Sequence, residues 1–419
     1  MSGRFRAAVD GVSTMGRLFL AARGGWRQRV QAALTQPEGQ RAAMAVLRLA
    51  QPHLTLRQNL VACYEGDGTL LVTRAADYHE VLSREADFEV VYGARMRMLT
   101  GGRDFFLGLQ DGAQYRRDTA AMAAIVKPED LAGVLAMARA EAAHAVAAGH
   151  GRIDLPPDLS ARIPALMVQH YFGVTGGLSL PQLIADATIL FHFLFSDLGA
   201  DPAVTRDAMD ARERVNAAID ASHRTAGPET LLGRALARGA AGDPAFDADG
   251  VRTQILGILI GAIPTLSKAS VLAVEELLRR PGPLKGAERA ALAGDEERVG
   301  QYLFEALRFS PANPVIYRRA ARDVRLGNTE VPRGRMVLAA NLSAMHDGAV
   351  VEEPDSFRPG RPWEVYQLWG TGLHRCWGDR INRAILPAML LPLLARPGLR
   401  AEAPPEAAPF PRHYRLAWD

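Results

Sequence analysis

The most informative stretch of the sequence is WGTGLHRCWG, residues 369–378, which sets one of the chain's two cysteines in a glycine-rich loop. Glycines let the backbone turn tightly and approach a flat partner closely. The pattern from about 377 to 395 predicts a helix, so Cys376 is expected at a helix start. A helix N-terminus stabilises a thiolate through its dipole and its free N–H groups. Cys376 is therefore a candidate nucleophile or metal ligand, and a buried free thiol is the plain alternative.

The surroundings of Cys376 narrow these options. Zinc binding is not expected, because neither a second cysteine nor a tight histidine cluster is nearby. A catalytic pair with the neighbouring His374 stays open. The second cysteine, Cys63, lies far away in the sequence, so a disulfide scaffold is excluded, and two unpaired thiols fit a reducing cytoplasm.

The composition is that of a globular protein. The chain has 419 residues, 48% of them hydrophobic, which excludes disorder over most of its length. Its 49 basic and 46 acidic residues leave a net charge of +3. This lacks the large excess of positive charge that is typical of nucleic-acid-binding proteins. There is no run of about 18 uninterrupted apolar residues, so no transmembrane span is expected. We expect a cytoplasmic protein.

Helical patterns dominate the rest of the chain. Alternating residues predict strands over 59–64 and 69–74, joined by a hairpin turn. Helices are predicted for 119–149, 160–173, about 250–280 and about 295–309, and short strands for 314–340. The interpretation is a mainly α fold, a large helical body with a minor β part. We expect a helical N-terminal extension over 1–50 and one catalytic domain over 51–419.

Three further motifs lie upstream of the loop. Glu305 and Arg308 are three residues apart on a predicted helix, which puts carboxylate and guanidinium on one face. A stretch RRAARD begins at Arg318, and PDSFRPGR, residues 354–361, ends at Arg361. An isolated acid–base pair at this spacing is usually an ordinary surface ion pair. Its position, 71 residues before Cys376, makes it informative.

Together the four motifs resemble those of the cytochrome P450 superfamily, whose haem loop has the pattern F-x-x-G-x-x-x-C-x-G. Trp369 stands where the family has phenylalanine. The resemblance implies a P450 fold, with haem b between the long central helix and the Cys-loop helix and Cys376 as the iron ligand. It also implies contacts of Trp369, Gly370 and Gly378 with the haem, and of Arg318 and His374 with its propionates. By the same analogy Arg361 locks onto the Glu305–Arg308 pair and holds the loop.

Two departures from the family pattern stand out. The family has [AG]-G-x-[DE]-T on its long helix, and this chain has GAIPT, residues 261–265. The resemblance makes Ala262, Pro264 and Thr265 catalytic positions, but Pro264 replaces the acid, has no proton to relay and kinks a helix interior. Tyr115 stands where relatives have a propionate-binding histidine, and one hydrogen bond from its phenol is expected instead.

The default chemistry implied by the family is a monooxygenase reaction: one oxygen atom from O₂ enters an apolar small molecule. Electrons would come from a ferredoxin- or flavodoxin-type donor, for which a basic patch is expected, made of Arg116, Arg117, Arg375, Arg380 and Arg383. Because of Pro264, a peroxygenase, isomerase or lyase acting on lipid hydroperoxides remains the alternative. A non-catalytic haem-binding protein is the second alternative.

The substrate is expected to be apolar. By family topology, the residues expected around the substrate are Phe191, Phe195, Ile258, Asn313 and Val315. Apolar and aromatic linings of this kind bind lipids, terpenoids or aromatic compounds. Plain core packing is the competing explanation for the aromatic residues between 187 and 198, and Asn313 is the one polar group expected to orient the substrate.

Overall fold

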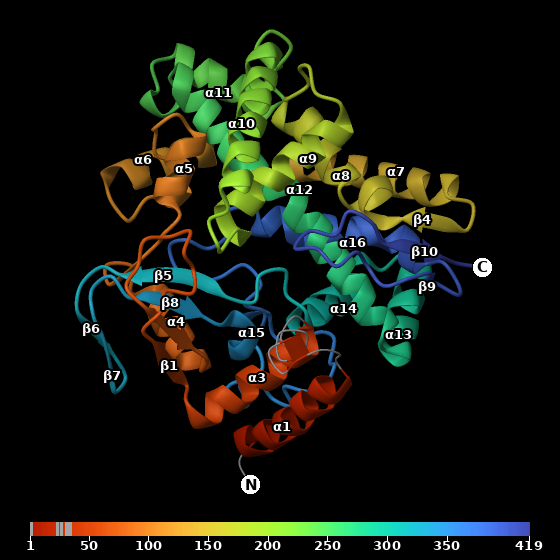
Figure 1. Ribbon diagram of the computed structural model, residues 1–419. Helices are drawn as coiled ribbons and strands as arrows, with labels where there is room; N and C mark the ends of the chain where they lie inside the picture. Colours follow the sequence, from red (N-terminus) through yellow and green to blue (C-terminus); the bar gives the residue numbers. More distant parts are fainter. Residues whose placement is uncertain (1–2, 22–24, 26–27, 30–35) are drawn as a thin grey trace. The chain divides into compact units, whose positions relative to one another are not determined.

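The computed structural model describes residues 3–21, 25, 28–29 and 36–419. Its internal contacts divide the chain into two compact units. Unit 1 comprises Met1–Val61, Glu65–Glu89 and Phe304–Cys376, and unit 2 comprises Ala62–Tyr64, Val90–Leu303 and Trp377–Asp419. Helices make up most of the described residues, and the strands are short and few (Figure 1). The predicted mainly α fold with a minor β part is therefore confirmed.

Unit 1 is built on a five-stranded sheet with the order β1-β2-β8-β5-β3. Its strands are β1 (His53–Leu56), β2 (Thr69–Val72), β8 (Met336–Ala339), β5 (Ile316–Ala320) and β3 (Phe88–Glu89). Only β2 and β8 run parallel, and the other pairs are antiparallel. A separate hairpin joins β6 (Val324–Leu326) to β7 (Thr329–Val331). The central strand β8 and its parallel neighbour β2 lie more than 250 residues apart in the sequence, so the sheet joins distant parts of the chain within unit 1.

The core of unit 1 lies where helix α4 (Ala75–Ser83) packs against this sheet. Leu70 and Val72 of β2, Val337 of β8 and Tyr78 and Val81 of α4 are all at most 1% exposed. Burying such side chains stabilises the fold by roughly 1.5–3 kcal/mol each. Apolar burial therefore fixes α4 on the sheet.

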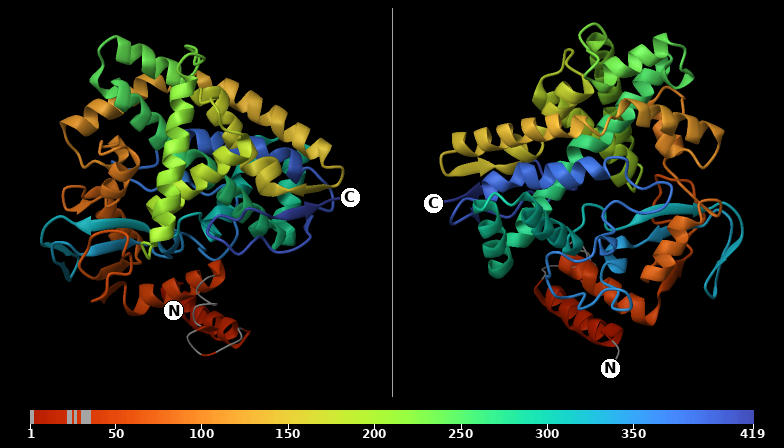
Figure 2. Two further views of the ribbon diagram at one scale, coloured as in Figure 1. Left: turned by 45° about the horizontal axis from the view of Figure 1, so that its top comes forward. Right: turned by 180° about the vertical axis from the view of Figure 1, so that it is seen from behind.

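The N-terminal helices belong to unit 1. Helix α1 (Gly3–Ala21) lies along α3 (Pro37–Ala50), as all views show (Figure 2). Helix α3 is attached through two arginines: Arg41 donates to the carbonyl of Phe309 over 2.6 Å, and Arg48 donates to Ser343 Oγ over 3.1 Å. Ser343 lies in the short helix α15 (Asn341–Ala344). The boundary expected at residue 50 stays a prediction, and residues 22–24, 26–27 and 30–35 of that extension lie outside the described residues.

Unit 2 is helical. Its helices are α5 (Gly93–Leu99), α6 (Ala113–Ile125), α7 (Asp130–Ala148), α8 (Arg162–Met167), α9 (Leu180–Phe191), α10 (Pro202–Ser222), α11 (Leu231–Ala240), α12 (Ala248–Leu278), α13 (Pro281–Leu292), most of α14 (Glu296–Phe309) and α16 (Asp379–Leu394). A small sheet has the order β4-β10-β9, with β4 (Arg152–Asp154), β10 (Arg415–Ala417) and β9 (Arg400–Ala401).

Helix α12 is the axis of unit 2, and α8, α9, α10 and α16 pack on it (Figure 1). Its first turn is capped by Asp247, whose Oδ1 accepts from the amide of Gly250 over 2.8 Å. Helices α7 and α12 are long and apolar enough to cross a membrane by length and composition, a test that the core helix of a soluble protein also passes. More than half of the apolar window of α12 is buried inside the protein, so its hydropathy is accounted for by packing.

Most predicted elements are confirmed, and two need correction. The strand predicted over 59–64 is wrong, because the partner of β2 is His53–Leu56. Backbone amides in the intervening turn donate hydrogen bonds to side chains instead of to a strand. The amide of Val61 donates to Asn59 Oδ1, and that of Leu60 donates to Thr69 Oγ1. The helix predicted over 119–149 is interrupted between α6 and α7, where Pro128 lies. A proline cannot continue the hydrogen-bond ladder of a helix interior.

Candidate functional site

The loop around Cys376 is a closed turn in unit 1. The amide of Cys376 donates to the carbonyl of Trp369 over 2.9 Å. Gly370 and Gly372 have φ angles of +70° and +75°, which side-chain-bearing residues rarely adopt. The thiol of Cys376 is exposed, and α16 begins three residues later, at Asp379. The loop thus presents its thiol just ahead of a helix N-terminus.

Trp369 is fixed by other aromatic side chains of unit 1. Its ring stacks on Trp363, with 5.5 Å between centroids and 23° between planes, and meets Phe304 edge-on at 5.8 Å. Phe304 is the residue before Glu305 on α14. The aromatic residue that precedes the cysteine is therefore packed against the helix that carries the acid–base pair.

Glu305 and Arg308 form a fully buried ion pair. Arg308 donates from Nη2 to Oε1 over 2.8 Å and from Nε to Oε2 over 3.0 Å, and both side chains are 0% exposed. Burial lowers the pKa of the Arg308 guanidinium, and Glu305 opposes that shift. Arg361 reaches the same carboxylate, and Tyr366 donates its hydroxyl to Oε2 over 3.2 Å. The ion pair expected between Arg361 and Glu305 is present.

A second buried group in unit 1 surrounds Arg318 on β5. Arg318 is 4% exposed, and its charge acts on the phenol of Tyr78, whose pKa is raised by burial. The Tyr78 hydroxyl is buried and has no hydrogen-bond partner among the described residues. The two ring nitrogens of His374 are also shielded from solvent. These donors suit an anion such as a carboxylate.

The catalytic positions expected on α12 belong to unit 2. The Thr265 hydroxyl donates to the carbonyl of Gly261, one turn earlier. Pro264 is buried inside the helix, which continues through it without a break, and it supplies no N–H for the carbonyl of Ile260. Ala262 is half-buried. Thr265 is thus the one side chain among these three positions that can hold a proton.

Two aromatic residues of unit 2 belong to, or directly follow, the motifs discussed above: Tyr115 and Trp377. Tyr115 lies on α6 and is 7% exposed. Trp377, the residue after Cys376, meets Phe106 edge-on at 5.2 Å, and its indole Nε1 is buried without a hydrogen-bond partner among the described residues. Gly378 has a negative φ, and a Cβ there would make only ordinary van der Waals contact with Asn382, 3.5 Å from its Nδ2, so the structure shows no steric need for glycine.

The expected substrate residues divide between the units. In unit 2, Phe191 and Phe195 are 4.7 Å apart between ring centroids, and Ile258 is half-buried on α12. In unit 1, Val315 is half-buried and Asn313 is exposed, and the backbone carbonyl of Asn313 accepts from Asn341 Nδ2 over 2.8 Å. Phe191 and Phe195 thus form a real aromatic pair.

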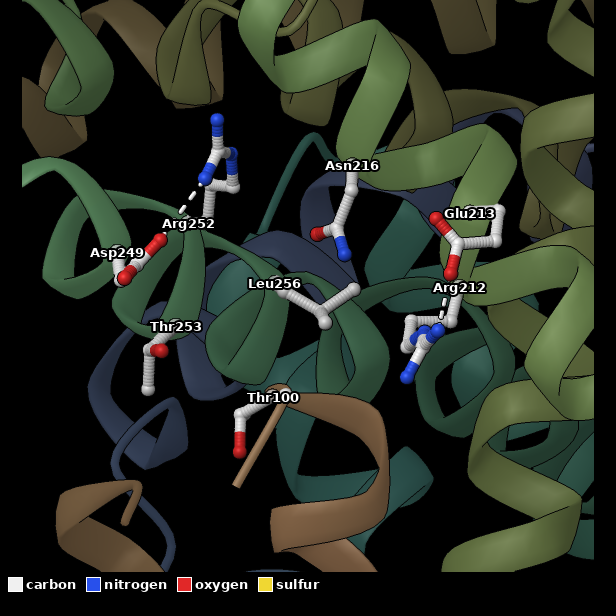
Figure 3. Close-up of a pocket in the computed structure, with 9 residues that line it drawn as sticks. Thr100, Arg212, Glu213, Asn216, Asp249, Arg252, Thr253 and Leu256 are labelled. Atoms are coloured by element: carbon white, nitrogen blue, oxygen red, sulfur yellow. Dashed lines mark hydrogen bonds and ion pairs between the residues drawn. The ribbon is translucent and has the colours of Figure 1, made fainter. Parts of the chain in front are cut away.

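A small cavity of unit 2 does not coincide with these residues. It is partly open to solvent and has a volume of about 220 Å³ between α10, the start of α12 and the turn after α5 (Figure 3). Asn216, Arg212 and Glu213 reach it from α10, and Asp249 and Arg252 from α12, where they pair over 2.9 Å. This volume is below the roughly 300–1,000 Å³ of ligand pockets. None of the expected substrate residues lines it.

The sequence analysis did not identify several polar groups of the site. Tyr78 looks like one more apolar residue of a short helix, and no sequence pattern indicates that it lies close to Arg318. Lys268 lies three residues after Thr265, and this helical spacing was available from the sequence. His192 lies between the two aromatic residues Phe191 and Phe193, so the segment was interpreted as apolar and the histidine was not singled out.

Comparison with known proteins agrees with this geometry. The family model described as Cytochrome P450 matches residues 299–397, which hold the buried acid–base pair and the cysteine loop. In this segment and in its four motifs the chain resembles the cytochrome P450 superfamily. Similar curated proteins are the Nocardicin C N-oxygenase of Nocardia uniformis subsp. tsuyamanensis, 30% identical over 57% of this chain and 62% of that protein, and Cytochrome P450-SU2 of Streptomyces griseolus, 25% identical over 83% and 85%.

The fold is that of solved P450 structures. The crystal structure of CalO2 superposes with a TM-score of 0.76 at 19% identity, over 92% of this chain and 98% of that one. The match with the Nocardicin C N-oxygenase spans about three fifths of that protein's length. The P450 fold is thus established here, whereas reaction, substrate and electron donor are matters for proposal.

The cofactor of the P450 superfamily is haem b, and the residues of this chain fit it. The described residues contain no cluster of three or more His, Cys, Asp or Glu side chains that could hold a metal ion. An exposed Cys376 thiol is a suitable axial ligand. The unpartnered hydroxyl of Tyr78 beside Arg318 in unit 1, and the indole N–H of Trp377 in unit 2, suit propionate carboxylates.

Proposed function

We propose that this P450 is a monooxygenase that inserts one oxygen atom from O₂ into an apolar small molecule. The observation that carries the proposal is the exposed Cys376 thiol, held in a loop whose Trp369 packs on the helix of the Glu305–Arg308 pair. Such a loop serves a thiolate ligand whose position must not vary. We further propose that the protein is cytoplasmic, where Cys63 and Cys376 stay reduced.

The residues of this chain would divide the work as follows. Bound haem with a thiolate ligand supplies the activation of the O–O bond. Thr265 holds a proton at Oγ1 and keeps it directed to the Gly261 carbonyl until an acceptor competes for it. Phe191 and Phe195 exclude water and provide apolar contact area for a substrate.

The electrons would come from an external ferredoxin- or flavodoxin-type donor. Of the five arginines expected to attract it, three are paired with acids: Arg116 with Asp111 over 2.7 Å, Arg117 with Asp118 over 2.8 Å, and Arg383 with Asp379 over 3.4 Å. Each of these pairs largely cancels its own charge. Docking would therefore depend more on Arg380, which is exposed.

A second function, the use of a substrate that already carries its O–O bond, is favoured by Pro264. This residue is buried within an unbroken helix, so no acid can replace it by a local shift of register. A hydroperoxide isomerase, lyase or peroxygenase would need neither a proton relay from this position nor an electron donor. The two functions therefore differ in one measurable requirement.

The haem ligand is tested by the absorption spectrum of the reduced protein under CO, in the wild type and in C376A. A red-shifted thiolate-type CO band in the wild type that is lost in C376A supports the proposal. C63A is the matched control, since it removes the chain's other cysteine and should leave the band unchanged. An identical band in C376A would exclude Cys376 as the ligand.

The reaction type is tested with the same preparation. Oxygenated product formed with NAD(P)H, a reductase and a ferredoxin supports the monooxygenase, and T265A should lower product formed per electron consumed. Conversion of lipid hydroperoxides without a donor would favour the second function. Haem binding without turnover in either assay would favour a non-catalytic protein.

A further inference from the structure

One half-buried lysine lies close to the expected catalytic position on α12. Lys268 follows Thr265 by three residues, so both side chains lie on one face of the helix, about 4.5 Å apart along its axis. The chain has only three lysines, and Lys127 and Lys285 are exposed. Arginine serves as the cation nearly everywhere else, so a half-buried lysine at this place calls for an explanation.

The ammonium group of Lys268 has no counter-charge among the residues that the structure describes. No described residue forms an ion pair or a hydrogen bond with it, and its Nζ lies 5.1 Å from the centroid of the Phe410 ring. The acid of this neighbourhood, Asp197, is committed elsewhere: it binds Arg95 over 2.9 Å and accepts from the amide of Asp201 over 3.0 Å. Burial lowers the pKa of Lys268 to about 8. An uncompensated buried cation is costly, and a bound anion would remove that cost.

His192 supplies a second polar group at the same ring. It begins the π-helical turn His192–Ser196 at the end of α9, and its ring centroid lies 6.3 Å from that of Phe410. Its Nδ1 is buried and has no hydrogen-bond partner among the described residues. Burial and the positive charges of Arg95 and Lys268 lower its pKa, and Asp197 opposes them. His192 is therefore a neutral imidazole with hydrogen-bonding capacity to spare.

Apolar surface surrounds these two groups. Phe410 also meets Phe191 edge-on at 5.5 Å, and Phe191 packs on Phe195. Helix α9 lies against α12 (Figure 1), so one cation and one imidazole interrupt a wall of aromatic rings within unit 2. This arrangement matches a molecule with an apolar body and one singly charged anionic end.

We propose that Lys268 and His192 bind the carboxylate of an otherwise apolar substrate, whose hydrocarbon part lies against Phe191, Phe195 and Phe410. The proposal rests on the proposed function and narrows its substrate class to apolar carboxylic acids. A carboxylate carries one charge, which balances one ammonium, whereas a phosphate dianion would leave a charge unpaired. Lys268 donates a charge-assisted hydrogen bond, and the imidazole of His192 satisfies the second oxygen.

The test is calorimetric binding of octanoate, decanoate and dodecanoate to the haem-loaded protein at pH 7, each compared with its primary amide. K268M removes the charge and keeps an apolar stem, K268R keeps the charge, and K285M is the matched surface control. We expect K268M to bind the acids about tenfold or more weakly and the amides as the wild type does. K268R should stay within a few-fold, and K285M should be unchanged.

Several results would overturn the proposal: no binding of any of the three acids, equal binding of acid and amide by the wild type, or equal weakening of both in K268M. The last result would mean that Lys268 only packs. The assay uses no electron donor and no turnover, so a failed monooxygenase assay leaves it unaffected. The CO band of each variant separately reports whether the haem site is intact.

A pH series gives an independent readout of the same contact. Acid binding should weaken between pH 7 and 9, as Lys268 loses its proton, while amide binding stays constant. The other charged groups facing the site do not account for this window, because Asp197 and Arg95 are paired and the pKa of His192 is lowered. Acid affinity that is flat from pH 7 to 9 would contradict a role for Lys268.

Discussion

Arg361 donates its Nε–H to Oε1 of Glu305 over 3.1 Å, and the two side chains are 5% and 0% exposed. The remaining donors of Arg361 hold three backbone carbonyls, those of Glu352, Glu353 and Ser356, at 2.6, 2.9 and 2.8 Å. One guanidinium thus ties the segment before the cysteine loop to α14. Buried ion pairs contribute less to stability than their Coulomb energy suggests, but removing one partner is expensive.

We therefore expect R361Q to lose about 3 kcal/mol of unfolding free energy, because several buried groups lose a charged donor. R358Q is the matched control: Arg358 lies on the same segment, but its side chain pairs with Glu352, which is 80% exposed. That change should cost at most about 1 kcal/mol. Urea unfolding followed by helix content measures both, and equal losses would show that burial of the Glu305 contact is unimportant.

Gly372 is expected to tolerate no side chain. Its φ is +75°, and a Cβ there would lie 2.2 Å from the carbonyl oxygen of Leu82. Gly177 has a φ of +76° with nothing within 4 Å of a Cβ, so G177A isolates the conformational cost, about 1–2 kcal/mol. G372A must also move the backbone, so it should cost more and reduce haem content. Equal stability losses and full haem loading in both variants would contradict this.

Much of this site was accessible from the sequence because its parts are local. The spacing from Trp369 to Gly378 is a property of one loop, and Glu305 and Arg308 share a helix face through their three-residue separation. The long helix containing Pro264 could be predicted because an apolar segment of that length is too long for a strand and therefore favours a helix. Spacing within one element is enough for such predictions.

The remainder depends on pairings that no local pattern encodes. The partner of β2 is His53–Leu56, and the more strand-like segment 59–64 forms a turn, because strand formation follows the available partner more than intrinsic preference. Likewise, Phe410 meets Lys268 only because the C-terminal segment returns to α12. Such contacts follow from tertiary structure alone.

Replacing Pro264 should stabilise the protein. A proline in a helix interior costs about 3 kcal/mol through a missing hydrogen bond and a steric clash. P264A restores an N–H for the Ile260 carbonyl but leaves a small void, so we expect a net gain of about 1–2 kcal/mol. P281A is the control, because Pro281 opens α13, where its ring is tolerated. Thermal unfolding compares them, and no gain in P264A would mean that the surroundings compensate for the proline.

The last prediction concerns pH and Lys268 in the ligand-free protein. Its pKa falls from an ordinary value of 10.5 to about 8 on folding, because burial disfavours the charged form. Below pH 8 the lysine is charged in both states, and its burial destabilises the fold fully. Between pH 8 and about 10.5 the unfolded chain binds the proton that the folded chain has lost, so stability relative to K268M rises with pH.

K268M should therefore be more stable than the wild type at pH 7, and the difference should shrink as the pH rises from 8 to about 10.5. Urea unfolding at pH 7, 8, 9 and 10 measures it, with K285M expected to show no trend, since Lys285 is exposed. A difference that stays constant over this range would mean that Lys268 keeps its charge while buried. The cation would then be solvated or paired in the folded protein, and the reason for expecting an anion beside it would be gone.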